Sequence, residues 1–218
     1  MGKQKKTKPD ESKHAVVNSF TQYIQRAGKR PRSFIEFCEA QELKPEEART
    51  HYRTLAALEK AVWLHWFEET LSVLANSEEY KDYSARERLL SFYYTWMDTV
   101  KPFSDYMKTA PTLPKLFSGV DWFLADMQRA FLKYAKELVQ LAASNEEIMK
   151  RPIVQNYYDN ALWQQFLFIM NYWLKDKSEE QTKTDEAIER AVNLILELAG
   201  RNQLDSILDF GKFLFKKN

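Results

Sequence analysis

Apolar residues recur along this chain at intervals of three and four positions, which is the period of an α-helix with one buried face. The first such stripe lies between His14 and Ala27, and Gly28 follows at a position where glycine commonly ends a helix. Its members are Val16, Val17, Phe20, Tyr23, Ile24 and Ala27. The pattern therefore predicts a first helix over residues 14–27.

Three more helices are predicted in the first third of the chain. Ser33 is suited to cap a helix that ends near Leu43. The side chains that this helix turns inward are Phe34, Phe37 and Cys38. The other two are a short helix over 45–52, which opens on Pro45, and a longer helix over 55–75.

The helical period continues in the rest of the chain. Ser84 and Glu87 have the spacing of a capping box, so a helix is predicted to begin there and to break before Pro102. A long amphipathic stripe then runs from Val120 to Leu141 and stops at Ser144-Asn145. The remaining predictions are an irregular segment or short helix over 103–117, helices over 153–175 and 184–199, and a final helix from Asn202.

Composition favours the same fold class. The 218 residues include only five glycines and seven prolines, whereas Leu, Ala, Glu, Lys and Gln, which favour helices, are plentiful. With 44% hydrophobic and 14% aromatic residues, the chain can bury one large core or two small ones. No segment has the pattern of a convincing strand, so we expect an all-α fold.

Residues 13–60 carry a more specific pattern. An aliphatic residue precedes a glycine at the end of the first predicted helix, a serine and a hydrophobic residue open the second, and a His-aromatic pair ends the third. The residues concerned are Ile24 and Gly28, Ser33-Phe34, Phe37-Cys38, Leu43, His51-Tyr52 and Leu58. In this order and spacing they resemble, without a gap, the N-terminal helix-turn-helix domain of the TetR family of transcriptional regulators.

The resemblance implies a helix-turn-helix DNA-binding domain over 13–57, here called the head. A flexible basic tail over 1–12 would precede it, and a helical ligand-binding and dimerisation domain of TetR type over 58–218 would follow. In such heads the third helix enters the major groove of DNA. The predicted DNA-binding residues are Lys29, Arg30, Arg32, Ser33, Lys44, Glu46, Glu47, Arg49, Thr50, His51, Tyr52 and Arg53.

The distribution of charge fits a head that binds a polyanion. Residues 1–55 hold 12 Lys and Arg against 7 Asp and Glu, whereas the remainder holds 20 against 24. A basic module joined to an acidic one is typical of nucleic-acid-binding proteins, although a tail that only improves solubility would give the same excess.

Several head residues depart from the family pattern. Glu42 stands where the family usually has a glycine, Arg49 where it has a tyrosine that contacts phosphate, and Leu55 where it has a lysine. Arg49 can still bind phosphate. Glu46 and Glu47 would repel phosphates unless one accepts a hydrogen bond from a cytosine amino group. The alternative is that the two carboxylates only stabilise the short helix through its dipole.

The predicted body domain is rich in aromatic and methionine side chains. In TetR-type proteins the corresponding helices enclose an inducer cavity, so an apolar effector pocket and ordinary core packing are both open. The predicted ligand-binding residues are Tyr93, Trp96, Phe103, Trp122, Met127, Phe131, Tyr134, Trp163, Phe166 and Met170.

The helices predicted over 153–175 and 184–199 form the candidate dimer interface. The first is apolar around most of its circumference, and such a helix has more apolar surface than one monomer core can cover. A homodimer would place two recognition helices on successive half-sites of a palindrome.

Other classes of function lack their motifs. The sequence has no nucleotide-binding glycine loop, no paired Cys/His spacing and no nucleophile-base arrangement, so we expect no enzyme, metal site or cofactor. The single Cys38 is expected to be a small core residue. The basic, polar start lacks a secretory apolar run, and no segment approaches the ~20 apolar residues that span a bilayer. We therefore expect a cytoplasmic protein.

The leading hypothesis is a ligand-responsive TetR-like regulator that binds double-stranded operator DNA as a homodimer and responds to a small apolar effector. The alternative is a TetR-fold protein that has lost DNA reading and binds an apolar lipid or isoprenoid-like ligand. A third possibility is a helical adaptor that binds a partner protein through exposed aromatic side chains.

Overall fold

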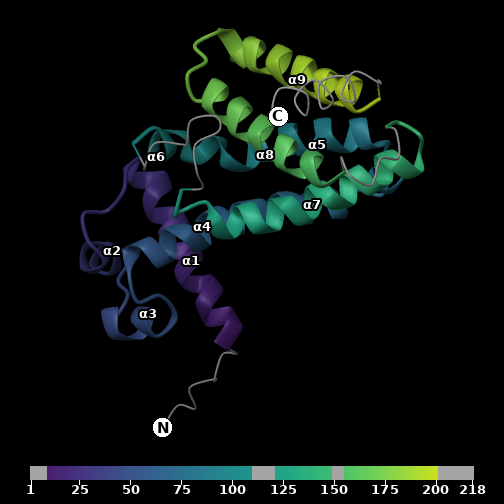
Figure 1. Cartoon of the computed structure of the whole chain (residues 1–218). Helices are drawn as coiled ribbons and strands as arrows, with labels where there is room; N and C mark the ends of the chain where they lie inside the picture. Colours follow the sequence, from purple (N-terminus) through teal and green to yellow (C-terminus); the bar gives the residue numbers. More distant parts are fainter. Residues whose placement is uncertain (1–8, 110–120, 149–154, 201–218) are drawn as a thin grey trace, which may run out of the picture. The chain divides into compact units, whose positions relative to one another are not determined.

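The computed structural model of the chain describes residues 9–109, 121–148 and 155–200 (Figure 1). These residues form helices and contain no β-strand, as the helical period predicted. The final helix expected from Asn202 lies outside the described residues.

Nine α-helices and three short 3₁₀ helices make up the part of the chain that the structure describes. The α-helices are α1 (Pro9–Ala27), α2 (Phe34–Ala40), α3 (Pro45–His51), α4 (Leu55–Ala75), α5 (Ala85–Val100), α6 (Ser104–Thr109), α7 (Ala125–Ser144), α8 (Gln155–Trp173) and α9 (Thr182–Gly200). The 3₁₀ helices are η1 (Glu79–Lys81), η2 (Lys101–Phe103) and η3 (Glu179–Gln181).

Most helix starts follow the local chemistry that predicted them. The Ser33 hydroxyl accepts a hydrogen bond from the Glu36 amide at 3.1 Å and so caps α2, and Pro45 is the first residue of α3. The capping box of α5 is formed in both directions. The Ser84 amide donates to Glu87 Oε2 at 2.8 Å, and the Glu87 amide donates to Ser84 Oγ at 3.2 Å.

Two helix starts differ from the prediction by five residues. α1 begins at Pro9 rather than His14, so residues 9–12, which were assigned to the tail, are helical. The physical reason is local, because proline fits the first position of a helix. α7 begins at Ala125 rather than Val120.

The described residues divide into two compact units. Unit 1 comprises 9–71, 96–109 and 121–129, and unit 2 comprises 72–95, 130–148 and 155–200. The helices α4, α5 and α7 therefore contribute residues to both units. These units are defined by packing. The boundary between the DNA-binding head and the ligand-binding domain, between residues 57 and 58, stays a prediction.

Aromatic rings fill the core of unit 1. The Phe20 ring meets the Phe37 ring edge-on at a centroid distance of 5.2 Å, which joins α1 to α2. The Trp66 ring stacks on Phe103 at 4.7 Å, which joins α4 to η2. Aromatic contacts therefore join helices both within the head and between α4 and η2 in unit 1.

Unit 2 has its own aromatic core and an antiparallel helix pair. The Phe131 ring lies 5.3 Å from Trp163 and 5.2 Å from Phe166, which fixes α7 against α8. α8 and α9 run side by side (Figure 1), and Gln165 Nε2 on α8 donates to the Ala191 carbonyl oxygen on α9.

Candidate functional site

The connection that leads into α2 is fixed by hydrogen bonds within the head. Besides donating its amide to Ser33, Glu36 uses its carboxylate to accept a bond from the Arg32 amide at 2.7 Å. The Tyr23 hydroxyl on α1 donates to the other Glu36 oxygen at 3.4 Å. α1 and α2 are therefore held in one arrangement at the start of the helix-turn-helix.

The turn between α2 and α3 is made by a residue in a left-handed conformation. Glu42 has a φ of 53°, and the Leu43 amide donates to the Cys38 carbonyl oxygen at 2.8 Å. α2 ends at Ala40, before the predicted end near Leu43, because the chain reverses at Glu42. The sharp turn sets α3 at an angle to α2 (Figure 1).

The surface of α3 is mixed in charge. Ala48 is buried inside the head. The exposed side chains of α3 include Glu46, Glu47, Arg49 and Thr50. Lys44 Nζ lies 3.1 Å from Glu47 Oε1, and both side chains are about three-quarters exposed. An ion pair so exposed to solvent contributes little stability, so Lys44 can exchange this partner for another anion.

The guanidinium of Arg49 lies against an aromatic ring of α2. Its guanidinium carbon lies 5.8 Å from the centroid of the Phe34 ring, and Phe34 is buried at the start of α2. This contact holds the guanidinium beside α3, and the Arg49 side chain stays exposed to solvent.

The predicted DNA-binding residues fall into three groups by exposure. His51 is half-buried and Tyr52 is buried, where the Tyr52 ring receives Lys13 Nζ at 5.8 Å from its centroid. The exposed residues are Lys29, Arg30, Arg32, Ser33, Lys44, Glu46, Glu47, Arg49, Thr50 and Arg53. The structure thus brings most of the predicted set to the surface of the α1–α3 segment.

Arg30 is exceptional because it already has a strong partner. Its Nε lies 2.7 Å from Glu59 Oε1 and its Nη2 donates to Glu59 Oε2 at 2.8 Å, which is a two-point ion pair. The Tyr106 hydroxyl donates to Glu59 Oε1 at 3.2 Å. Burial raises the pKa of the Glu59 carboxyl, and the bonds from Arg30 and Tyr106 oppose that rise.

The sequence contained a signal for this buried carboxylate that the initial prediction missed. Glu59 lies on the same face of α4 as the buried Trp63, four residues later, and it directly follows the buried Leu58. A charged residue on an apolar helix face indicates a buried ion pair, but its partner is not adjacent in the chain.

The predicted ligand-binding residues are mostly core. They are divided between the units, with Trp96, Phe103, Trp122 and Met127 in unit 1 and the rest in unit 2. Eight are buried, Tyr134 is half-buried and Trp122 is 42% exposed. The rings of Phe131, Tyr134, Trp163 and Phe166 pack against one another in unit 2, as in an ordinary core, and a role in ligand binding stays a prediction.

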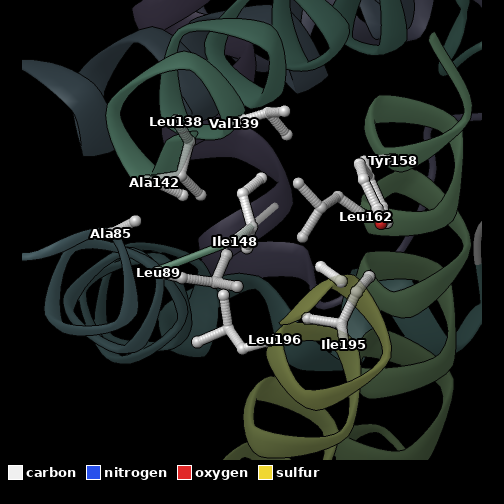
Figure 2. Close-up of a pocket in the computed structure, with 11 residues that line it drawn as sticks. Ala85, Leu89, Leu138, Val139, Ala142, Ile148, Tyr158, Leu162, Ile195 and Leu196 are labelled. Carbon is white, nitrogen blue, oxygen red and sulfur yellow. The ribbon is translucent and has the colours of Figure 1, made fainter. Parts of the chain in front are cut away.

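A small apolar pocket lies in unit 2, lined by residues that were not predicted. Leu89 of α5, Leu162 of α8 and Ile195 of α9 reach it, as does Ile148, and Figure 2 shows their aliphatic side chains around one space. The remaining lining residues are Ala85, Leu138, Val139, Ala142, Tyr158, Leu196 and Ala199. The cavity volume is about 30 Å³, whereas sites for drug-sized ligands occupy roughly 300–1,000 Å³.

The outer faces of α8 and α9 are less apolar than the sequence led us to expect. The monomer buries Leu162, Trp163, Phe166, Leu167, Ile169, Met170 and Trp173 of α8. Phe168 and Tyr172 remain 37% exposed each, with ring centroids 6.0 Å apart, and Leu194 of α9 is 59% exposed. Among the described residues, the large apolar side chains that α8 and α9 leave exposed are Phe168, Tyr172 and Leu194, which are here together called the α8–α9 patch.

Other chemistry is limited in the described residues. Cys38 is buried and burial raises the pKa of its thiol. The His14 and His65 rings, far apart in the chain, lie 6.2 Å apart, but no three His, Cys, Asp or Glu side chains in the described ranges are grouped to hold a metal ion. No helix of the described part is both long enough and apolar enough to cross a membrane.

Comparison with known proteins identifies the family. A family model described as the tetracyclin repressor-like C-terminal domain matches residues 88–214, more than half of the chain. The chain belongs to the TetR family. A solved structure similar to this TetR-family chain is a bacterial regulatory protein in the tetR family from Rhodococcus RHA1. Its TM-score is 0.51 at 17% identity, with 89% of this chain and 98% of that chain covered. No curated protein matches the chain.

The TetR model covers the C-terminal part, so the head lies outside the matched residues. The likeness to the Rhodococcus protein extends over most of the chain and, at its low identity, shows the fold. The TetR pattern has glycine at the position of Glu42, and the φ of 53° there accounts for that preference, since glycine adopts this conformation without steric cost. The substitution leaves the turn in place in this TetR-family member.

Proposed function

We propose that the protein is a ligand-responsive transcriptional regulator that binds operator DNA as a homodimer. The observation that carries this proposal is the helix-turn-helix of α1–α3, whose last helix exposes Arg49 and Thr50 while Ala48 anchors it to the head. Side chains on the exposed side of such a helix are the ones that reach base edges and phosphates in the major groove.

The basic residues around α3 would supply the contacts to the DNA backbone. Lys29 and Arg32 lie in the connection before α2, Lys44 precedes α3 and Arg53 follows it, and all four side chains are exposed. Phosphate contacts of this kind provide affinity and orientation, whereas bases provide specificity. Of the two carboxylates on α3, Glu47 is paired with Lys44, which reduces its repulsion of phosphate.

The test of DNA binding is selection from genomic fragments followed by fluorescence anisotropy on the enriched sequence at several salt concentrations. The Lys44→Ala/Arg49→Ala variant should bind at least tenfold more weakly, and its slope of log affinity against log salt should fall by about 0.9 per lost phosphate contact. A matched control, Lys133→Ala/Lys136→Ala, removes two exposed charges from α7 and should bind as the wild type. Salt-insensitive or absent binding by the wild-type protein would reject the proposal.

We further propose that an apolar effector acts on unit 2 through the pocket between α5, α7, α8 and α9. Its lining is aliphatic apart from the Tyr158 ring, so the ligand would be a hydrocarbon-rich molecule rather than a polar one. Because about 30 Å³ is too little for such a ligand, binding must widen the pocket by separating these helices. That separation would be the conformational change that an effector stabilises.

Native mass spectrometry of the purified protein, with extraction of any retained lipid-soluble molecule, tests the effector site. Ala142→Leu places three more carbon atoms in the pocket and should abolish retention of the ligand, whereas Ala161→Leu, on the exposed side of α8, should not. Equal retention by both variants would exclude this pocket.

The second candidate function is that of a TetR-fold protein that binds an apolar ligand and does not read DNA. The specific observation in its favour is the exposed carboxylate of Glu46 on α3, which has no hydrogen bond or ion pair among the described residues. Retention of an apolar ligand together with no DNA binding in the anisotropy assay would favour this function over the first.

A further inference from the structure

The buried carboxylate of Glu59 ties together three segments of unit 1. Glu59 lies on α4 and its side chain is 1% exposed, Arg30 lies in the connection between α1 and α2, and Tyr106 lies on α6. Arg30 contacts both carboxylate oxygens, at 2.7 and 2.8 Å, and Tyr106 contacts Oε1 at 3.2 Å. We call these three residues the Glu59 cluster.

A carboxylate withdrawn from water in this way imposes a geometry on its partners. Burial of an ionised group is unfavourable unless an opposite charge and further hydrogen bonds compensate it, so loss of either partner leaves an uncompensated charge. The planar guanidinium satisfies both oxygens only in one orientation. The Glu59 cluster therefore fixes Arg30, and with it the connection that leads to Ser33 and α2.

The same connection also passes close to α6 at Gly28. Gly28 has a φ of 63°, and a Cβ built on it would lie 3.6 Å from the Cβ of Asp105, the neighbour of Tyr106. The Gly28 amide also donates to the Ile24 carbonyl oxygen at 2.9 Å, which ends α1. The connection from α1 to α2 thus passes close to α6 at Gly28 and is linked to it at Arg30 through Glu59 and Tyr106.

The pairing changes the role of Arg30 in the head. Within the cluster its positive charge is neutralised by Glu59, so it offers little to a DNA phosphate compared with Lys44 or Arg49, whose side chains are exposed on or beside α3. Arg30 acts on the head by shaping the connection before α2.

We infer that Glu59 is a positioning residue of the DNA-binding head: by holding Arg30 and Tyr106, it fixes the connection between α1 and α2 against α4 and α6, and tight DNA binding requires this fixed connection. The inference rests on the proposed function, since it concerns how the same helix-turn-helix is presented to DNA.

Three variants of the full chain test the inference, with DNA affinity, its salt slope and hydrogen exchange of residues 28–33 as the measurements. Tyr106→Phe removes only the hydroxyl and keeps the ring contacts of Tyr106, and Arg30→Lys keeps the charge but not the two-point geometry. Glu59→Gln removes the buried charge. The control is Tyr83→Phe, which removes a hydroxyl that donates to the Glu79 carboxylate in unit 2.

Tyr106→Phe and Arg30→Lys should weaken DNA binding by about tenfold with an unchanged salt slope, because a positioned contact is lost and no phosphate contact is. Exchange at 28–33 should become faster in both, and Tyr83→Phe should match the wild type. Full affinity in Arg30→Lys, or tighter binding with a steeper slope in Glu59→Gln, would overturn the inference. If Glu59→Gln does not fold, Tyr106→Phe still tests the positioning role of Glu59, because it is the mildest change.

The measurements distinguish failure of this inference from failure of the proposed function. If the wild type binds no DNA, the proposed function fails and the inference fails with it. If the wild type binds DNA and Arg30→Lys or Tyr106→Phe keeps full affinity, only the inference is overturned.

Discussion

Glu42 and Gly28 both have a left-handed backbone conformation, but its steric cost differs between the two residues. Gly28, with φ 63°, adopts it freely, whereas Glu42, with φ 53°, places its Cβ against the following carbonyl oxygen. The glycine was predicted as the end of the first helix and the structure confirms that role. The conformation of Glu42 could not be predicted from a charged side chain, because turns usually place glycine or asparagine there.

Replacement of Glu42 by glycine should therefore stabilise the protein by up to about 1 kcal/mol, because relief of the left-handed conformation exceeds the added entropy of the unfolded chain. Urea unfolding measures the change. The control, Glu39→Gly, places glycine inside α2 and should destabilise by about 1 kcal/mol. Equal destabilisation by the two variants would contradict the argument.

Asp176 carries the clearest pH dependence of a single residue. Hydrogen bonds from Ser178 and Thr184 hold the pKa of its carboxyl at about 2. Its Oδ1 accepts from the Ser178 amide at 2.8 Å, and its Oδ2 accepts from the Thr184 amide at 2.8 Å. These bonds fix the connection between α8 and α9.

Because the folded pKa of Asp176 lies below its unfolded value of about 3.9, its stabilising contribution is present above pH 4 and is lost as the pH falls through 2. Asp176→Asn should therefore be less stable than the wild type at pH 6, and the difference should shrink towards pH 2. Chemical unfolding at a series of pH values measures it. A difference that is constant with pH would show that the carboxylate charge is not the cause.

At the scale of elements, helix starts depended on chemistry within a few residues, and for this reason sequence predicted them well. The capping box at Ser84 and Glu87 and the cap at Ser33 are confirmed. The second cap of α5 could not be predicted from the sequence. Glu147, distant in the chain, accepts from the Ala85 amide at 2.9 Å and the Arg86 amide at 3.3 Å.

Ser84→Ala should lower the free energy of unfolding by about 1 kcal/mol, since an amide at the start of α5 loses its hydroxyl partner. Urea unfolding followed by circular dichroism measures this. Ser72→Ala, at an exposed position inside α4, should be neutral or slightly stabilising because alanine is the better helix former. A loss at Ser72 as large as that at Ser84 would reject the capping explanation.

The aromatic residues of unit 2 allow a test of core packing against ligand binding. Phe131→Ala should destabilise by about 3–5 kcal/mol, because the ring is fully buried among Trp163 and Phe166. Trp122→Ala should cost much less, since its side chain is 42% exposed. If thermal unfolding shows little change for Phe131→Ala, the ring does not act as core and its predicted role at a ligand cavity gains support.

At the scale of the whole molecule, the proposed homodimer depends on a small surface. The α8–α9 patch of Phe168, Tyr172 and Leu194 is the apolar part of the faces expected to pair. α9 also carries charged side chains, and Arg190 pairs with Glu186 across one helical turn. A dimer through this face would combine a small apolar centre with a polar rim.

The variant Phe168→Glu/Leu194→Glu should shift the protein from dimer to monomer, because it places like charges at the centre of an interface with two-fold symmetry. Sedimentation velocity over a range of concentrations measures the shift. Lys133→Glu on α7 changes charge outside the patch and should leave the assembly unchanged. A dimer that persists in the double variant would place the interface elsewhere.

The sequence by itself determined the all-α fold, the order of the described helices, most of their starting residues and the resemblance of the head to the TetR family. These features follow from side-chain period, caps and turns, which act between residues close in the chain. Only the tertiary structure decided that Arg30 binds Glu59, that most of the predicted ligand-binding aromatics are buried core, and that aliphatic residues of four helices line the pocket. Such pairings join residues far apart in the chain, and neither period nor local chemistry specifies which distant side chain completes a buried contact.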